Sequence, residues 1–419
     1  MSLHQVSDVA SHSKIDLDIQ EIKTAVGQSD WATAKQIYEG GKNSKKPDGT
    51  VRNLKSFSTS FSTAGASQAE PLAQLGKAYW GRYDYGNAMV TAALTGQDDA
   101  QFGNYATGSL AKKADARSQV IEKGIQFSAV WQYALHEMES ALAKYKEGKY
   151  DVAKGAPYYL DEAWAFYAGS LETGGATGVS TYIAAEKQGP KFGTQGYQTG
   201  TAGRSRVTME LLYQFNAMQR YLQTPGNDEA IASIAKCVRA QWKVPLIQGC
   251  LYYAHASSSA KITDSEGLTK IKAEAWAYCV PILPSLNEAD PASAQLVQDA
   301  VSISSDKRPD WEVVKKAFST QNLNKMGVMC EDIGYLGSNG FNAATYAESS
   351  PLTLAERTNC KDDNALIRAN AFADSTKCAT VKMPRCGNGV VCSASAYLLP
   401  SQILALLALS CVSFFFARH

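Results

Sequence analysis

Apolar residues recur at intervals of three and four through Ala-rich segments from residue 15 to about residue 320. This spacing places them on one face of an α-helix, whereas the period-2 alternation of a β-strand is scarce. The sequence therefore predicts an all-α protein. Helical segments are predicted at residues 15–41, 70–96, 116–147, 156–173, 205–223, 227–257, 267–285, 291–303 and 309–320.

Composition and charge narrow the class of protein. The chain has 419 residues, of which 45% are hydrophobic and 19% charged, so it can bury a sizeable core. Lys and Arg together number 41 against 40 Asp and Glu. With no basic excess to bind phosphates, we expect no nucleic-acid partner.

The helical body shows signs of an internal duplication. A glycine-rich stretch at 174–204 predicts a long loop that divides residues 15–340 into halves at about 15–185 and 205–330. The segment "DEAWAFYAGSLE" in the first half resembles "AEAWAYCVPILP" in the second, with Glu162 and Glu274 in register. We therefore predict a duplicated helical bundle. A helical-repeat protein is the alternative, although no period of about 34 residues can be followed.

A second pair of segments supports the same interpretation. "SDWATAKQIY" and "PDWEVVKKAF" each place an Asp-Trp at the predicted start of a helix, one in each half. Asp accepts hydrogen bonds from the free backbone N–H groups of a first helical turn. Asp30 and Asp310 are therefore predicted to be helix N-caps.

The two ends of the chain indicate its compartment. Residues 396–419 form a hydrophobic C-terminal segment that follows small residues at Asn388 or Ser393, the layout of a GPI-attachment signal. A transmembrane anchor helix is the alternative. Residues 1–14 contain no apolar signal-peptide region, so we expect the secretory signal to be missing from this sequence.

The chain has nine cysteines. Many lie in the predicted Cys-containing extension at 341–395. An even number remains if Cys411 is removed with the anchor signal, which favours disulfides formed in an oxidising compartment. The pairing is left open, and scattered free thiols are the alternative.

The segment "YALHEMESAL" at 133–142 carries candidate metal ligands inside an otherwise apolar helix. His136 and Glu139 are three residues apart and project from one face, while Glu137 is turned about 100° from His136. A buried carboxylate is costly unless it is paired or bound to a metal. We therefore predict a metal site at His136 and Glu139, with Glu137 as a weaker candidate.

Other acids and histidines extend this prediction. Glu162 and Asp161 could complete the first site, and His255 with Glu274 could form an accessory site in the second half. The remaining histidines, including His12, lie near the chain ends and are set aside. Carboxylate and imidazole donors suit iron, with manganese or zinc as alternatives.

Two other functions remain open at this point. In a metal-free surface interaction protein, Tyr or Lys would pair with the buried acids. In a di-metal oxidase, a second set of carboxylates would have to lie beside the first. No nucleophile triad, P-loop or HExxH motif is present, so we expect a binding protein rather than an enzyme.

The segments "WQYALHEMESALAKY", "YYLDEAWAFYAGSLE" and "EAWAYC" resemble the algal iron-assimilation proteins, a low-iron-inducible and high-CO2-inducible family of the periplasm or cell surface. The resemblance covers residues 15–340. Residues 134–139 are also similar to the G-x-H-x-x-E motif of imelysin-like periplasmic proteins, with Ala134 in the place of Gly. That motif implies that His136 and Glu139 bind metal.

The resemblance implies a secreted, periplasmic or cell-surface protein that captures iron for high-affinity uptake. The implied partners are the iron ion and a plasma-membrane iron importer or a ferroxidase. Contact with the membrane is expected only through the C-terminal anchor.

Overall fold

The fold is built almost entirely of helices, which confirms the all-α prediction. The computed structural model describes residues 3–336 except 4, 64, 108–109, 111–112, 173–176, 195–204, 259–263, 306 and 335, together with the strands at 385–386 and 390–391. The predicted extension at 341–395, apart from these strands, and the anchor signal at 396–419 lie outside the described residues.

The elements follow one another along the chain with short connections. The helices are α1 Ala10–Ser13, α2 Ile15–Gly27, α3 Trp31–Gly40, α4 Ser56–Thr59, α5 Pro71–Trp80, α6 Tyr85–Thr95, α7 Ala114–Gly124, α8 Trp131–Lys146, α9 Ala156–Ala168, α10 Tyr182–Gln188, α11 Arg206–Tyr221, α12 Asp228–Ser258, α13 Ser265–Cys279, α14 Leu283–Ala289, α15 Pro291–Val301, α16 Trp311–Ala317, α17 Thr320–Lys325 and α18 Cys330–Ile333. The 3-10 helices are η1 Ser60–Ser62, η2 Ala66–Ala69 and η4 Gly189–Phe192, and η3 Ile125–Val130 is a π-helix. The strands are β1 Asp98–Asp99, β2 Gly103–Asn104, β3 Arg385–Cys386 and β4 Val390–Val391, paired antiparallel as β1 with β2 and β3 with β4.

The predicted Asp caps are confirmed. Asp30 Oδ1 accepts a hydrogen bond from Thr33 N at 3.0 Å at the start of α3. Asp310 Oδ1 accepts one from Glu312 N at 3.0 Å at the start of α16. The cap at Asp30 also corrects the prediction of one helix over 15–41, because Ser29, with φ +58°, ends α2 and lets the chain turn into α3.

The predicted long loop over residues 174–204 is wrong in part. Helix α10 and η4 lie inside it. Tyr182, Ile183, Ala184 and Ala185 are buried, and α10 packs on α12. Tertiary contacts therefore stabilise a short helix in a stretch whose glycines favoured a loop.

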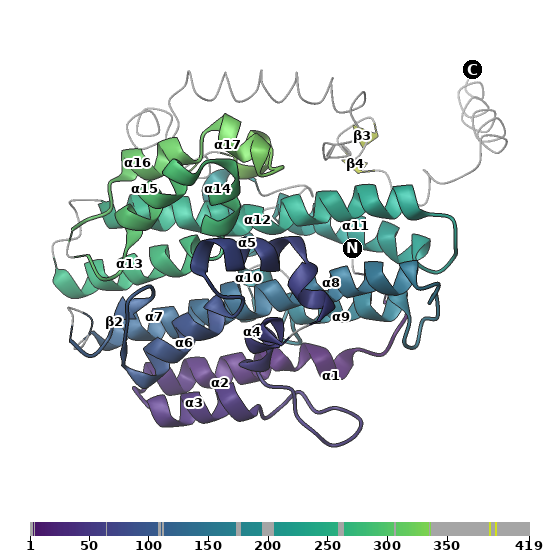
Figure 1. The fold of residues 1–419 in the computed structure, drawn as a ribbon, viewed down its shortest axis with the longest axis horizontal. Coiled ribbons are helices and arrows are strands. Elements are labelled where there is room, and N and C mark those ends of the chain that lie inside the picture. The colour runs from purple at the N-terminus through teal and green to yellow at the C-terminus, as the bar shows by residue number, and fades with distance from the viewer. Residues whose placement is uncertain are drawn as a thin grey trace, which may run out of the picture.

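One hydrophobic core runs through the described helices, from Ile15 to Leu336. Helix α8 packs along α9, and α12 packs against both α11 and α13. Figure 1 shows α11 and α12 above α8 and α9, with α2 and α3 at the lower edge. Residues of both predicted halves contribute to this core, while the duplication itself remains a prediction.

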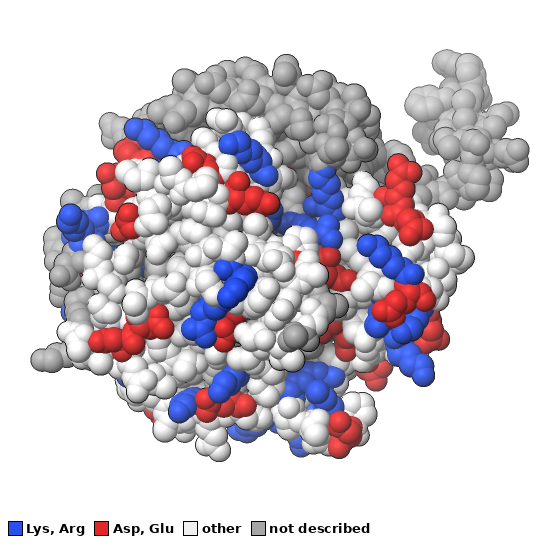
Figure 2. Space-filling view, viewed as in Figure 1, with Lys and Arg blue, Asp and Glu red and all other residues white. Residues whose placement is uncertain are grey.

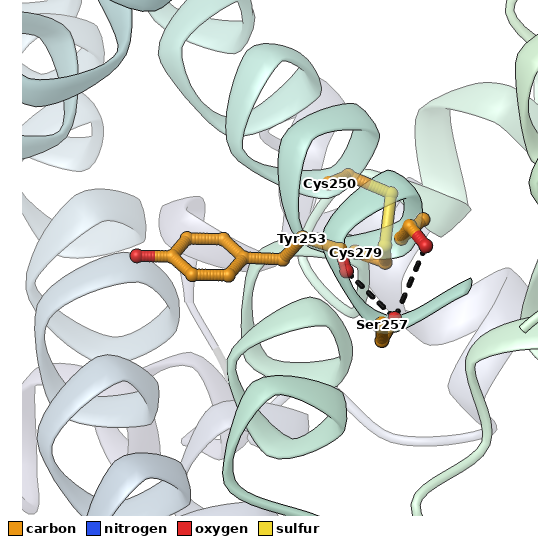
Figure 3. Close-up of a disulfide and its surroundings, with 5 residues drawn as sticks. Cys250, Tyr253, Ser257 and Cys279 are labelled. Carbon is orange, nitrogen blue, oxygen red and sulfur yellow. Dashed lines mark hydrogen bonds between the residues drawn. A yellow bond between two sulfur atoms is a disulfide. The ribbon is translucent and has the colours of Figure 1, made fainter. Parts of the chain in front are cut away.

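A disulfide between Cys250 and Cys279 joins α12 to α13. Figure 3 shows the bond beside Ser257, whose hydroxyl donates to the backbone oxygen of Tyr253 at 2.7 Å. Cys237 and Cys330 are also disulfide-bonded. These bonds confirm the predicted disulfide-forming use of the body cysteines and settle one pairing.

The surface carries charges of both signs. Lys and Arg alternate with Asp and Glu over the face drawn in Figure 2, as the near-neutral net charge predicts. Among the described helices, none is both long and apolar enough to cross a membrane.

Candidate metal centre

Helix α8, which carries three of the predicted ligands, is fixed to α12 by a reciprocal tryptophan pair. Trp131 Nε1 donates to the backbone oxygen of Trp242 at 3.0 Å, and Trp242 Nε1 donates to that of Trp131 at 3.0 Å. Both side chains are buried. Because α8 also packs along α9, the position of Glu137 relative to Glu162 is set by this helix packing.

Glu137 on α8 and Glu162 on α9 form what we call the inner acid pair. Glu137 is 5% exposed and Glu162 is 8% exposed. A tyrosine hydroxyl is hydrogen-bonded to each carboxyl group, Tyr133 to Glu137 and Tyr158 to Glu162. Two carboxyl groups from facing helices are thus held together with two phenol oxygens.

The pKa values show the cost of placing these acids together. Burial, followed by the nearby charge of Glu162, raises the pKa of Glu137 to about 8. Burial and the charge of Glu137 hold the pKa of Tyr133 well above its usual value. Burial and Glu162 raise the pKa of Tyr158 to about 12. At neutral pH Glu137 is therefore mostly protonated, and both phenols keep their protons.

His12, from the short helix α1, reaches the same cluster. Its Nε2 atom lies 2.5 Å from Glu162 Oε1 and is also contacted by the guanidinium of Arg52. A single ring nitrogen cannot donate to a carboxylate and accept from a guanidinium at the same time. The two contacts therefore cannot both be hydrogen bonds of this nitrogen, and the positive charge of Arg52 also acts on Tyr133 and Tyr158.

Asp161 holds the N-terminal segment that delivers His12. Its Oδ2 atom accepts hydrogen bonds from Val6 N and Ser7 N, both at 2.8 Å. Its Oδ1 atom accepts one from Gln219 Nε2 at 2.6 Å. Burial raises the pKa of Asp161, although these hydrogen bonds act to lower it. One oxygen of this carboxyl group thus holds the N-terminal segment, and the other ties α9 to Gln219 on α11.

His136 and Glu139 take separate partners from other elements, which we call the outer ion pairs, although the His136 ring lies 5.4 Å from that of Tyr133, centroid to centroid. His136 Nδ1 lies 2.5 Å from Glu70 Oε1, just before α5. Glu139 accepts two hydrogen bonds from Arg239 on α12, at 2.5 and 2.6 Å. Burial alone would lower the pKa of His136. The hydrogen bond and the charge of Glu70 act in the opposite direction, and the pKa is raised overall.

The two predicted residues of the second half lie apart from these clusters. His255 packs edge-on against Trp311, and burial lowers its pKa. Glu274 is hydrogen-bonded to Tyr253, and Lys123 and Lys191 lie near it. Burial raises the pKa of Glu274, while Lys123 acts in the opposite direction. Lysine ammonium groups therefore lie beside Glu274, where the resemblance between the two halves of the chain predicted an accessory metal site.

Tyr133, Tyr158 and His12 were not predicted from the sequence to belong to the centre. The tyrosines had a detectable signal, because Tyr133 precedes Glu137 by four positions and Tyr158 precedes Glu162 by four, the spacing of helical neighbours. Position 270, four before Glu274, is Lys instead. His12 had no local signal, since only tertiary packing brings α1 to α9.

A family model described as low iron-inducible periplasmic protein (Fea1) matches residues 2–351. This match includes α1 to α18 and therefore every residue of the inner acid pair and the outer ion pairs. The chain belongs to this family. Membership confirms the resemblance to the iron-assimilation proteins. The family description itself names a periplasmic protein that is induced by low iron.

Comparison with curated proteins and with solved structures identifies no further relative. No curated protein and no solved structure matches the chain. Within the part of the chain that the structure describes, no three His, Cys, Asp or Glu side chains are grouped so that they could hold a metal ion. The hydroxyl groups of Tyr133 and Tyr158 place two further oxygen atoms beside the inner acid pair.

Proposed function

We propose that this member of the low iron-inducible periplasmic family captures iron at the inner acid pair. Glu137 and Glu162 would bind the ion, His12 would supply a nitrogen donor, and Tyr133 and Tyr158 would supply phenol oxygens. The proposal is carried by one observation: two buried carboxyl groups lie so close that the charge of one raises the pKa of the other. A multivalent cation would offset both the repulsion and the burial of these charges.

The donor types support iron as the bound ion. Carboxylate and phenol oxygens with one imidazole form a hard donor set, which suits iron or manganese better than the thiolate-rich sites of structural zinc. Zinc and manganese are the competitors to test. The family's induction by low iron favours iron among the three.

The centre supports binding rather than a reaction. Capture at the cell surface requires that the ion be taken up and later given to a membrane importer or a ferroxidase. Glu162 and His12 belong to different segments of the chain, α9 and α1. Movement of α1 would therefore open the site without disturbing the pair of long helices.

Metal titration of matched variants tests the proposal. Glu137→Gln/Glu162→Gln keeps the side-chain shapes and removes both ionisable carboxyl groups, so stoichiometric iron binding should be lost. Glu274→Gln is the matched control, because it also removes a partly buried carboxyl group hydrogen-bonded to a tyrosine. Iron content by elemental analysis and titration with ferrous and ferric ion measure the outcome. Undiminished binding by the double variant would overturn the assignment.

A second variant separates the inner acid pair from the resemblance-based site. The imelysin-like motif implies that His136 and Glu139 bind the ion, whereas the structure gives these residues Glu70 and Arg239 as partners. His136→Ala/Glu139→Ala should therefore retain iron if the inner acid pair is the site. Loss of iron in this variant, with retention in Glu137→Gln/Glu162→Gln, would move the site to the outer ion pairs.

A further inference from the structure

Lysines from four elements meet on a part of the molecule built from α2, α7, α10 and η4. They are Lys23 on α2, Lys123 on α7, Lys187 on α10 and Lys191 on η4. Partial burial lowers the pKa of Lys187, whose side chain is otherwise exposed, and the charges of Lys123 and Lys23 lower it further. Burial lowers the pKa of Lys191 to about 8. The ammonium groups are thus close enough to repel one another.

Nearby carboxylates neutralise only part of this charge. Glu122 Oε1 lies 3.0 Å from Lys123 Nζ and 3.2 Å from Lys23 Nζ, so it serves both of these lysines. Glu274 lies near Lys123 and Lys191 but is hydrogen-bonded to Tyr253. Among the described residues, no carboxylate forms an ion pair with Lys187 or Lys191. Positive charge therefore remains at this pair.

Two tyrosines of α12 form a platform under Lys191. Its Nζ atom lies 3.5 Å from the ring centroid of Tyr252 and 5.2 Å from that of Tyr253. An aromatic face attracts an ammonium group but cannot cancel its charge. Figure 3 shows Tyr253 projecting from α12 away from the Cys250–Cys279 disulfide. The two tyrosines lie on α12, and this disulfide ties α12 covalently to α13.

We propose that Lys187 and Lys191, the latter lying over Tyr252 and Tyr253, form a binding site for a small oxyanion, either a phosphate group or a polycarboxylate, with Lys123 on the buried side of the site. Such an anion would accept charge-assisted hydrogen bonds from the ammonium groups and relieve their repulsion. Lys187 is exposed and Lys123 is buried, so the ligand would enter at Lys187. The site uses other residues than the inner acid pair and does not depend on iron binding.

Calorimetric titration of the full chain with inorganic phosphate and with citrate tests the site at low ionic strength. Wild type should bind at least one of the two probes saturably. Lys187→Gln/Lys191→Gln should weaken that binding by about tenfold or more, the loss expected for charge-assisted contacts. The control Lys144→Gln/Lys146→Gln removes the same number of charges from α8 and should leave the affinity unchanged.

The outcomes distinguish the ligand source and the role of charge. Binding of phosphate alone assigns a phosphate site, and binding of citrate alone assigns a carboxylate site. Lys191→Arg retains the charge and should restore most of the affinity lost in Lys191→Gln, while circular dichroism shows that each variant is folded. Absence of saturable binding to both probes, or equal binding by wild type and the double variant, would overturn the proposal.

Discussion

At the scale of single residues, the surroundings of each carboxyl group decide what it does. Glu139 faces Arg239 and is held by two hydrogen bonds. Glu137, two positions earlier, faces Glu162 instead and has its pKa raised to about 8 by burial and by that neighbour. The first carboxylate is neutralised within the fold. The second binds a proton, which a metal ion would have to displace under the proposed function.

The raised pKa of Glu137 predicts how iron affinity depends on pH. Below a pKa of about 8 the ion must displace the proton of Glu137, so affinity should rise with pH and level off above that value. One displaced proton corresponds to about tenfold in affinity per pH unit. Titrations over this range measure the slope, and Glu137→Gln is the control. A flat profile in wild type would contradict the role of Glu137.

At the scale of elements, α12 connects the centre to the rest of the fold. It spans Asp228–Ser258 with Pro245 inside it, and it bonds α8 through the Trp131–Trp242 pair. Its other face meets α13, where Gly249 leaves room for the ring of Tyr278. A close approach of this kind requires a residue without a side chain.

Gly249→Ala should destabilise the protein. An added Cβ atom would overlap the Tyr278 ring. Forcing α12 and α13 apart should cost about 2 kcal/mol, as overpacking of a core does. Urea denaturation followed by circular dichroism measures the loss. Gly27→Ala is the matched control, because a Cβ atom there meets nothing within 4 Å, and its stability should stay unchanged or rise slightly.

Removal of the α12–α13 disulfide should also lower stability. Cys250 and Cys279 are separated by 29 residues in the sequence. Opening a loop of this size should cost about 3.6 kcal/mol, mainly because the unfolded chain becomes less constrained. The double variant Cys250→Ala/Cys279→Ala, compared with wild type by urea denaturation, gives the value. An unchanged midpoint would mean that the bond adds nothing to stability.

At the scale of the whole molecule, the N-terminal segment completes the centre. Asp161 anchors Val6 and Ser7, and α1 then places His12 beside Glu162. The centre thus depends on contacts between residues at opposite ends of the first half of the chain. An ion bound there would join α1, α8 and α9.

Iron should therefore stabilise the native state as a whole. A ligand present at about 100 times its Kd adds about 2.7 kcal/mol to the free energy of unfolding. The melting temperature should rise by a few degrees with iron and return to the initial value with a chelator. Glu137→Gln/Glu162→Gln should show no such shift. Indifference of wild type to both iron and chelator would favour the metal-free interaction protein.

The sequence determined the helices because helical periodicity and capping act between neighbouring residues. The spacing of apolar positions predicted α7 to α9 and α11 to α13, and Asp30 and Asp310 marked two helix starts. The sequence also pointed to Glu137 and Glu162 as acids buried among apolar residues. It failed at α10, whose glycine-rich surroundings favour a loop until packing on α12 stabilises the helix.

The tertiary structure decided which charges meet. Glu139 and Arg239 are 100 positions apart, and His12 and Glu162 come from different helices. No local pattern encodes such pairs, because they depend on which helix faces pack together. His136 and Glu139 share a helix face as the sequence predicted, yet packing gives each its own partner. Packing leaves Glu137 and Glu162 together, and this follows from the contact of α8 with α9.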